Sequence, residues 1–209
     1  MGKVVDILKK VGAVITGDHF VYTSGKHGEV YINKDALYPH TKETGEVCRL
    51  MAELFKDKEV EAVAGPALGG IILSQWVAYH LSQIKGKEVF GVYTEKDEAE
   101  NQVLRRGYDQ VIKGKKVLVV EDLTTTGGSV KKVVEAVRQA GAEVVAVCVM
   151  VNRDPVNVNE STVGAPFVAA DVLEAKAFDE ADCPFCKANR PINIQVGHGR
   201  QYLENKGEK

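Results

Sequence analysis

The sequence predicts an α/β fold with a mostly parallel twisted sheet flanked by helices. Four short apolar runs cover residues 61–67, 88–93, 115–122 and 143–151, and they recur at intervals of roughly 27 residues, near the length of one strand and one helix. The runs are rich in valine and mostly do not alternate with polar residues, which is typical of parallel strands buried on both faces. Helical patterns lie between them, and this alternation indicates right-handed crossovers.

Three helices are expected around these strands. The first, at 42–57, precedes the first strand. The second, at 70–86, repeats apolar residues at three-and-four spacing, and Gly86 suits its C-terminal cap. The third, at 128–142, carries a stripe of valines and ends at Gly141.

The remaining segments are expected to form a lid and a hood around this core. Residues 94–114 are highly charged and have no sustained apolar stripe, and a connection of this length favours a functional lid. The core is expected at about 41–153, and the hood is expected to combine about 1–40 with 154–209, including a strand near 166–172. The whole chain is therefore expected to form a single domain with a small hood subdomain.

Composition excludes several classes of protein. The chain has 209 residues, of which 44% are hydrophobic, enough for one sizeable core. With 27 basic and 29 acidic residues the formal net charge is −2, which argues against a dedicated nucleic-acid binder. No apolar run reaches the length of a membrane span, and the first residues do not resemble a signal peptide. Four cysteines indicate no disulfide scaffold, so a cytoplasmic location is expected.

The strongest motif follows the third strand. This strand ends in two acids, Glu121 and Asp122, and a run of hydroxyls and glycines then opens a helix. Small residues allow backbone N–H groups to close around an anion at a helix N-terminus, so the run predicts a phosphate site. The acids can accept hydrogen bonds from a neighbouring diol, which together with the phosphate suggests a ribose 5-phosphate. Neither a P-loop nor a dinucleotide fingerprint is present.

The segment VLVVEDLTTTGGSV at 117–130 resembles the phosphoribosyl-pyrophosphate (PRPP) motif of type I phosphoribosyltransferases. Three further segments, 23–35, 65–70 and 104–122, resemble stretches of orotate phosphoribosyltransferases, and Arg153 lies where that family has an arginine for the orotate carboxylate. The resemblance implies a transfer of phosphoribosyl from PRPP to orotate, which gives orotidine 5'-phosphate and pyrophosphate in pyrimidine biosynthesis.

The resemblance also assigns roles to individual residues. PRPP is expected to contact Glu121, Asp122, Leu123, Thr124, Thr125, Thr126, Gly127, Gly128 and Ser129, together with Ala67 and Gly69 of the pyrophosphate turn. Catalytic roles are expected for Asp122 and for the lid cations Lys96, Arg105 and Arg106. Orotate is expected to contact Thr125, Arg153, Lys26 and Tyr31. Mg²⁺ is expected to be held mainly by PRPP, without direct side-chain ligands. The family also implies a homodimer in which the lid reaches the neighbouring subunit's site.

The chain departs from the best-known branch of that family at several positions. Gly69 replaces a lysine of the pyrophosphate turn, and Ala99 and Asn101 lie where the lid has a lysine and a histidine. Gly28 and Glu29 replace a Ser-Pro pair of the N-terminal segment.

Cys183 and Cys186 form a CxxC pair that leaves three interpretations open. Two reduced thiols in a structural turn are favoured over a zinc site or a redox pair. Zinc would need two more ligands, for which Cys48, Cys148 and His198 are the candidates.

Two alternative functions also remain open. A purine or xanthine phosphoribosyltransferase would share the PRPP motif, but its base has no carboxylate to pair with Arg153. A non-catalytic PRPP-sensing regulator would keep the phosphate site and lose the lid, whereas this lid retains three cations. The chain also shows no added DNA-binding domain.

Overall fold

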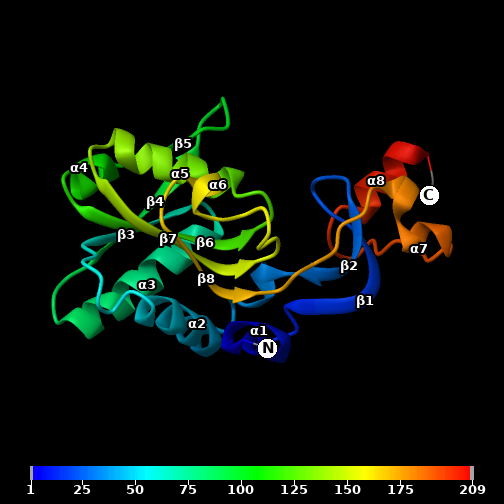
Figure 1. The fold of residues 1–209 in the computed structure, drawn as a ribbon, viewed down its shortest axis with the longest axis horizontal. Coiled ribbons are helices and arrows are strands. Elements are labelled where there is room, and N and C mark those ends of the chain that lie inside the picture. The colour runs from blue at the N-terminus through cyan, green and yellow to red at the C-terminus, as the bar shows by residue number, and fades with distance from the viewer. Residues whose placement is uncertain (1, 208–209) are drawn as a thin grey trace.

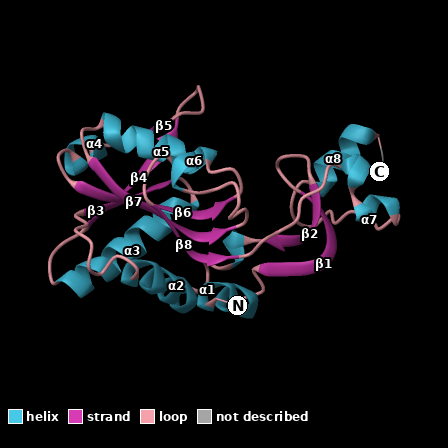
Figure 2. Cartoon of the chain, in the orientation of Figure 1, coloured by secondary structure: helices cyan, strands magenta, loops and turns pink. Residues whose placement is uncertain are grey.

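The computed structural model describes residues 2–207, which form two sheets surrounded by helices (Figures 1 and 2). The strands are β1 (Val14–Val21), β2 (His27–Ile32), β3 (Ala62–Pro66), β4 (Phe90–Lys96), β5 (Gln102–Val103), β6 (Lys116–Thr124), β7 (Glu143–Asn152) and β8 (Phe167–Val172). The α-helices are α1 (Lys3–Lys10), α2 (Thr41–Glu53), α3 (Gly69–Lys85), α4 (Tyr108–Ile112), α5 (Gly128–Gln139), α6 (Glu160–Val163), α7 (Pro184–Lys187) and α8 (Gly199–Lys206).

The larger sheet has six strands in the order β5-β4-β3-β6-β7-β8. All neighbours pair in parallel except β5, which pairs antiparallel with β4 at one edge. The smaller sheet is the antiparallel hairpin of β1 and β2. The predicted fold class, a mostly parallel sheet flanked by helices, is therefore confirmed.

Alternate residues of the central strands face two separate cores. On one face, Val63 of β3 and Leu118 of β6 pack with residues of α1, α2 and α3. On the other face, Ala62 and Val119 of the same strands pack with residues of α4, α5 and α6. Because both faces are covered, the strands need apolar residues at every position, which explains the valine-rich runs.

The core extends beyond 41–153 at both ends. Strand β8 pairs in parallel with β7 and is part of the main sheet, not of the hood. Helix α1 packs in the same core as α2, and the carboxylate of Asp171 in β8 accepts a hydrogen bond of 2.9 Å from the backbone N–H of Val5. The hood consists of the β1–β2 hairpin and the segment 174–207.

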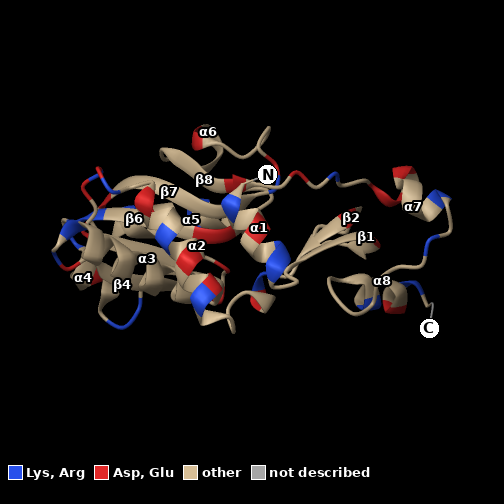
Figure 3. Ribbon diagram, turned by 90° about the horizontal axis from the view of Figure 1, so that it is seen from below, with Lys and Arg blue, Asp and Glu red and all other residues tan. Residues whose placement is uncertain are grey.

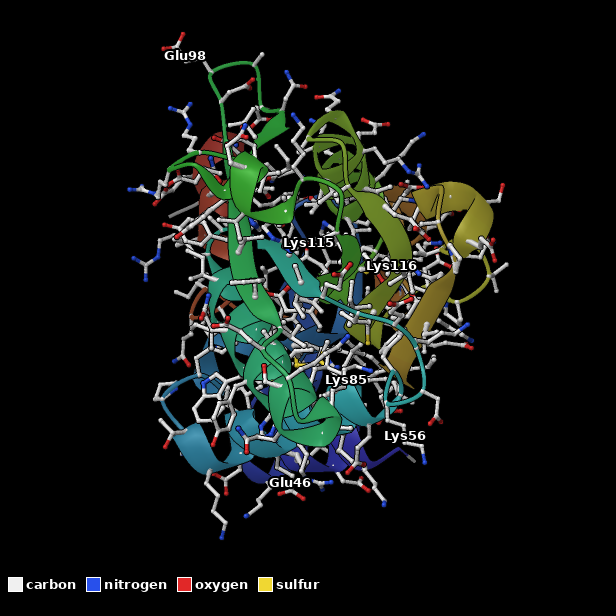
Figure 4. The ribbon with its side chains drawn as sticks, turned by 90° about the vertical axis from the view of Figure 1, so that its left-hand side faces the viewer. Glu46, Lys56, Lys85, Glu98, Lys115 and Lys116 are labelled. Carbon is white, nitrogen blue, oxygen red and sulfur yellow. The ribbon has the colours of Figure 1, made fainter. Side chains whose placement is uncertain are left out.

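The segment 94–114 has more structure of its own than its sequence indicates. Its first residues continue β4, and its middle forms β5 and α4. The buried hydroxyl of Thr94 donates to the Gln102 side-chain carbonyl over 2.7 Å, which fastens the base of this lid. Glu98 lies on the loop that projects furthest from the body of the sheet (Figure 4).

The hood lies at the opposite end of the molecule from α4 (Figure 1). Basic and acidic residues are interspersed along the helices, the strands and the connection from β8 to α7 (Figure 3). Among residues 2–207, none of the helices combines the length and the apolar character that crossing a bilayer requires.

Candidate active site

The phosphate cradle, residues 124–129, joins the end of β6 to the start of α5. A cavity of about 170 Å³ lies over it, and all six residues of the cradle line this cavity together with Glu121, Leu123 and Val130. Gly127 has a φ of 74°, which glycine adopts without a steric penalty from Cβ. Helix α5 begins at the next residue, so the N–H groups of its first turn have no partners within the helix. The cradle can therefore bind an anion through backbone donors and hydroxyls.

Asp122 is held in place by partners from outside its own strand. The residue is 4% exposed, and its Oδ2 accepts hydrogen bonds from Lys34 Nζ at 2.7 Å and Tyr38 Oη at 3.0 Å. Its Oδ1 accepts from the backbone N–H of Leu123 at 2.7 Å. Burial acts to lower the pKa of Lys34, but the charge and hydrogen bond of Asp122 outweigh it and raise that pKa. Lys34 therefore stays protonated as the partner of this carboxylate.

Glu121 is the acid that lines the cradle cavity. It is 7% exposed, and its Oε1 accepts a hydrogen bond of 3.0 Å from the backbone N–H of Asp122. Burial, followed by the neighbouring Asp122 charge, raises the pKa of Glu121. The two adjacent acids therefore differ: Asp122 is paired with a cation, whereas Glu121 faces the cavity.

The pyrophosphate turn, residues 65–70, connects β3 to α3 and needs its glycines for close packing. A Cβ on Gly65 would lie 2.6 Å from the carbonyl oxygen of Gly70. A Cβ on Gly69 would lie 2.2 Å from Asp122 Oδ2. A side chain at position 69 would therefore require Asp122 and Tyr38 to move, which gives a physical reason for the missing lysine. The backbone N–H of Ala67 donates to the carbonyl of Thr94, over 2.8 Å.

A second cavity of about 440 Å³ adjoins the cradle and shares Leu123, Thr125 and Thr126 with it. Its other lining residues come from the end of β7 and from the hood: Tyr22, Thr23, Ser24, Tyr31, Ile32, Asn33, Lys34, Asp35 and Arg153. We call it the base cavity.

Arg153 is the residue of the base cavity with an unused buried donor. Its guanidinium lies 4.6 Å from the centre of the Tyr22 ring, and its buried Nε has no hydrogen-bond partner among residues 2–207. Buried polar groups are rarely left unpaired, so this donor indicates a place for an acceptor. The preceding Asn152 is 2% exposed and accepts a hydrogen bond from Thr124 Oγ1 over 3.2 Å, which joins this strand end to the cradle.

The three lid cations lie together, apart from both cavities. Lys96, Arg105 and Arg106 line a separate hollow with Glu95. Arg106 donates to the Glu95 carboxylate at 2.9 Å, and Lys96 pairs with Glu100 at 3.1 Å. Within one chain they do not meet the phosphate cradle.

Of the remaining expected orotate contacts, the structure brings Tyr31 and Thr125 to the base cavity but not Lys26. The ammonium of Lys26 lies 3.5 Å from the carboxylate of Asp179, near the hood surface. Two residues of the site were not predicted from the sequence, namely Lys34 and Tyr38. Lys34 lies in the segment 23–35 that carries Tyr31, and Tyr38 follows it, but nothing in the spacing connects them with Asp122, more than 80 residues away.

The cradle, the acid pair and the pyrophosphate turn all lie at the carboxyl ends of neighbouring parallel strands, where ligands of α/β proteins bind. Together they define the class of protein as a phosphoribosyltransferase. The family model described as "Phosphoribosyl transferase domain" matches residues 33–163, and the chain belongs to this family.

Within the family, the chain belongs with the orotate phosphoribosyltransferases. It is 40% identical over 196 residues to the orotate phosphoribosyltransferase of Thermotoga maritima, covering 93% of this chain and 97% of that one. It is 38% identical over 192 residues to that of Caldanaerobacter subterraneus subsp. tengcongensis, covering 91% and 94%. The crystal structure of orotate phosphoribosyltransferase from Aeropyrum pernix superposes with a TM-score of 0.64 at 27% identity, covering 81% of this chain and 93% of that chain.

Proposed function

We propose that this chain is an orotate phosphoribosyltransferase, which converts PRPP and orotate into orotidine 5'-phosphate and pyrophosphate. The observation that carries this proposal is Arg153, which lines a cavity that shares a wall with the phosphate cradle and whose buried Nε has no partner among residues 2–207. A guanidinium with a free Nε and Nη edge can bind a carboxylate through two parallel hydrogen bonds. Orotate supplies that carboxylate, and the purine bases do not.

PRPP would bind with its 5-phosphate in the cradle and its ribose hydroxyls toward the acid pair. Glu121 would accept hydrogen bonds from the diol inside the cavity. Asp122, oriented by Lys34 and Tyr38, would lie between the ribose and the pyrophosphate turn. It packs against this turn so closely that a Cβ on Gly69 would lie 2.2 Å from its Oδ2. In this arrangement the reacting C1 would lie at the junction of the two cavities.

The reaction breaks the bond from ribose C1 to the pyrophosphate oxygen and forms a bond from C1 to the orotate ring nitrogen. Positive charge develops at C1 as pyrophosphate leaves, so positioning and charge stabilisation supply most of the catalysis. Arg153 would fix the orotate carboxylate, and Thr125 and Tyr31 would orient the ring beside C1.

The residues present fit a Mg²⁺ ion that PRPP itself would hold. Among the described residues, Glu121 is the acid lining the cradle cavity and Asp35 the acid lining the base cavity, while Asp122 is already engaged by Lys34. Mg²⁺ commonly keeps several waters and binds substrate phosphates with only one or two carboxylates. When bound, the ion would neutralise charge on the departing pyrophosphate.

The lid cations are proposed to act across a homodimer. Lys96, Arg105 and Arg106 are exposed and lie away from their own chain's cradle. Closing over a neighbouring subunit's pyrophosphate would bring them to developing negative charge and exclude water from the site. We place the reaction in the cytoplasm, where cysteine thiols remain reduced.

Pyrophosphate release from PRPP and Mg²⁺ tests the proposal, with orotate, uracil, hypoxanthine, xanthine and adenine compared at equal concentration. Release with orotate alone, abolished in Arg153→Ala, is the expected result. Release with a purine would retain the phosphoribosyl chemistry and refute the role of Arg153. PRPP binding without turnover on any base would instead favour a regulator.

A further inference from the structure

The hood contains a cluster of four potential metal ligands that the transferase reaction does not use. His19 lies on β1, His27 on β2, Cys183 directly precedes α7, and Cys186 lies within α7. Their ligand atoms all lie within 4.8 Å of one another. His19, His27 and Cys183 are buried, and Cys186 is partly exposed. Two histidines and two thiols thus converge from three segments of the chain.

The hydrogen bonding of His19 suits ligation through the nitrogen that faces the cluster. His19 Nδ1 lies 2.9 Å from the carbonyl oxygen of Arg190, so it donates its proton there and leaves Nε2 with a lone pair. That Nε2 faces His27 Nδ1 at 2.9 Å and the sulfurs of Cys183 and Cys186 at 3.7 Å each. His27 Nδ1 lies 3.3 Å from Cys186 Sγ.

These separations match the edges of a zinc tetrahedron. Bond lengths of about 2.3 Å to sulfur and about 2.0–2.1 Å to nitrogen imply ligand-to-ligand edges of about 3.3–3.6 Å. Four of the six edges, one between the two nitrogens and three between a nitrogen and a sulfur, measure 2.9 to 3.7 Å and lie around these values, and all six lie within 4.8 Å. A histidine pair linked only by a hydrogen bond would explain the nitrogen contact, but it would not explain two thiols facing the same point.

We propose that His19, His27, Cys183 and Cys186 bind a single structural Zn²⁺ ion. Two thiolates and two imidazoles are a donor set of structural zinc sites, which are closed and tetrahedral. A two-iron cluster held by two cysteines and two histidines needs the two ligand types on different irons, and the spacing within 4.8 Å leaves no room for that. Cys186 and His19 also line a cleft beside α8, which provides a route for the ion.

The zinc would stabilise the C-terminal segment of the hood, which contributes little to an apolar core. Within residues 174–207, the only residue in the buried apolar core is Cys183. Structural zinc contributes directly to folding in domains with small cores. Here it would fasten the C-terminal segment to the β1–β2 hairpin.

The same ion would brace the wall of the base cavity. His27 pairs with Val21 across the hairpin, and the backbone N–H of the next residue, Tyr22, donates to the carbonyl of Lys26 over 2.8 Å. Tyr22 is the ring beneath the Arg153 guanidinium. The zinc therefore lies directly behind the turn that shapes the orotate pocket.

The cysteine candidates suggested by the sequence do not contribute. Cys48 and Cys148 are buried in the core on one face of the main sheet, and His198 contacts the Thr23 hydroxyl at 3.0 Å. The ligands that complete the CxxC pair are His19 and His27, more than 150 residues away in the sequence.

Metal content of the purified full chain is the test, because it does not depend on the transferase activity. We expect one zinc per chain by elemental analysis, and we expect Co²⁺ exchanged into the site to give thiolate charge-transfer and tetrahedral visible bands. The double variant Cys183→Ser/Cys186→Ser and the single variant His19→Ala should lose the metal. The matched controls Cys48→Ala and His198→Ala should retain it.

Three results would overturn the proposal. One is a metal-free chain that takes up no stoichiometric zinc from ZnCl₂ under reducing conditions. Another is undiminished zinc in the double cysteine variant while that variant remains folded by circular dichroism. The third is a Cys183–Cys186 disulfide in protein purified under mild conditions, which would indicate a redox pair. With zinc bound, removal by a chelator should increase amide exchange in 15–31 and 174–206 and leave the main sheet protected.

Discussion

Replacing Gly69 by alanine should disorganise the Asp122 carboxylate without weakening the helix that Gly69 begins. The new Cβ would lie 2.2 Å from Asp122 Oδ2 and 2.5 Å from Tyr38 Oη, both shorter than any normal contact. The carboxylate would have to rotate, and its hydrogen bonds to Lys34 and Tyr38 would lengthen or break. Asp122 would then no longer be oriented toward the ribose.

The size of the effect follows from the hydrogen bonds involved. A hydrogen bond to a charged group contributes about 1.5–3 kcal/mol, so losing one oriented contact between Asp122 and the ribose should lower kcat/KM by roughly 10- to 150-fold. Stability should change less, because replacing glycine by alanine restricts the unfolded chain and stabilises the folded state by about 0.4–1 kcal/mol, which offsets part of the lost contacts. The variant should therefore fold and bind orotate, but turn over slowly.

Steady-state kinetics with PRPP and orotate, together with thermal unfolding, measure both quantities. Gly45→Ala is the matched control, because it lies within α2 and its Cβ would meet only Trp76, at 3.5 Å. In an Asp122→Ala background the collision with the carboxylate disappears, so Gly69→Ala should add little further loss. A Gly69→Ala enzyme within twofold of the wild type, or full additivity in the double variant, would refute this reasoning.

Three further variants test the neighbouring groups. Lys34→Ala should lower kcat/KM about tenfold by removing a charged partner of Asp122, and unchanged kinetics would show that Tyr38 alone orients the carboxylate. Glu121→Gln should flatten the pH dependence of stability: burial and the Asp122 charge raise the Glu121 pKa from 4.5 to about 8. Between these two pKa values the folded state therefore keeps a proton that the unfolded chain loses. The unfolding free energy of the wild type should fall by up to ~1.4 kcal/mol per pH unit as the pH rises through that range. Urea titrations at pH 5 to 8 that give the wild type and Glu121→Gln the same dependence of unfolding free energy on pH would contradict this. Arg153→Ala should weaken the binding of orotate far more than the binding of PRPP in equilibrium titrations, and a parallel loss of both would mean that Arg153 does not bind the base.

Local sequence patterns predicted the parts of the fold that depend on burial. The valine-rich runs become β3, β4, β6 and β7 because strands covered on both faces need apolar residues throughout. The phosphate cradle was also predictable, since a strand, two acids and a glycine-rich turn occur consecutively and need no distant partner. Thr125 and Gly127 therefore lie where the sequence places them.

Long-range contacts account for what the sequence did not predict. Lys34 and Asp122 are in contact although 88 residues separate them in the sequence, and His19 and Cys183 are in contact although 164 residues separate them. Contacts between residues so far apart in the sequence produce no periodic pattern. Strand β8 lies in the main sheet although no helix of normal length precedes it, so the strand–helix rhythm did not assign it. The lid was predicted to lack secondary structure because its sequence has no apolar stripe. It contains β5 and α4, which have only two and five residues, too few to produce such a stripe.

The central claim is that the cradle and the base cavity together join a phosphoribosyl group to orotate. Its most direct test is to quantify orotidine 5'-phosphate and pyrophosphate formed from PRPP and orotate in the presence of Mg²⁺. We expect equal amounts of both products, with formation lost in Arg153→Ala while PRPP still binds. Pyrophosphate without orotidine 5'-phosphate, or a nucleotide formed only from a purine, would contradict it.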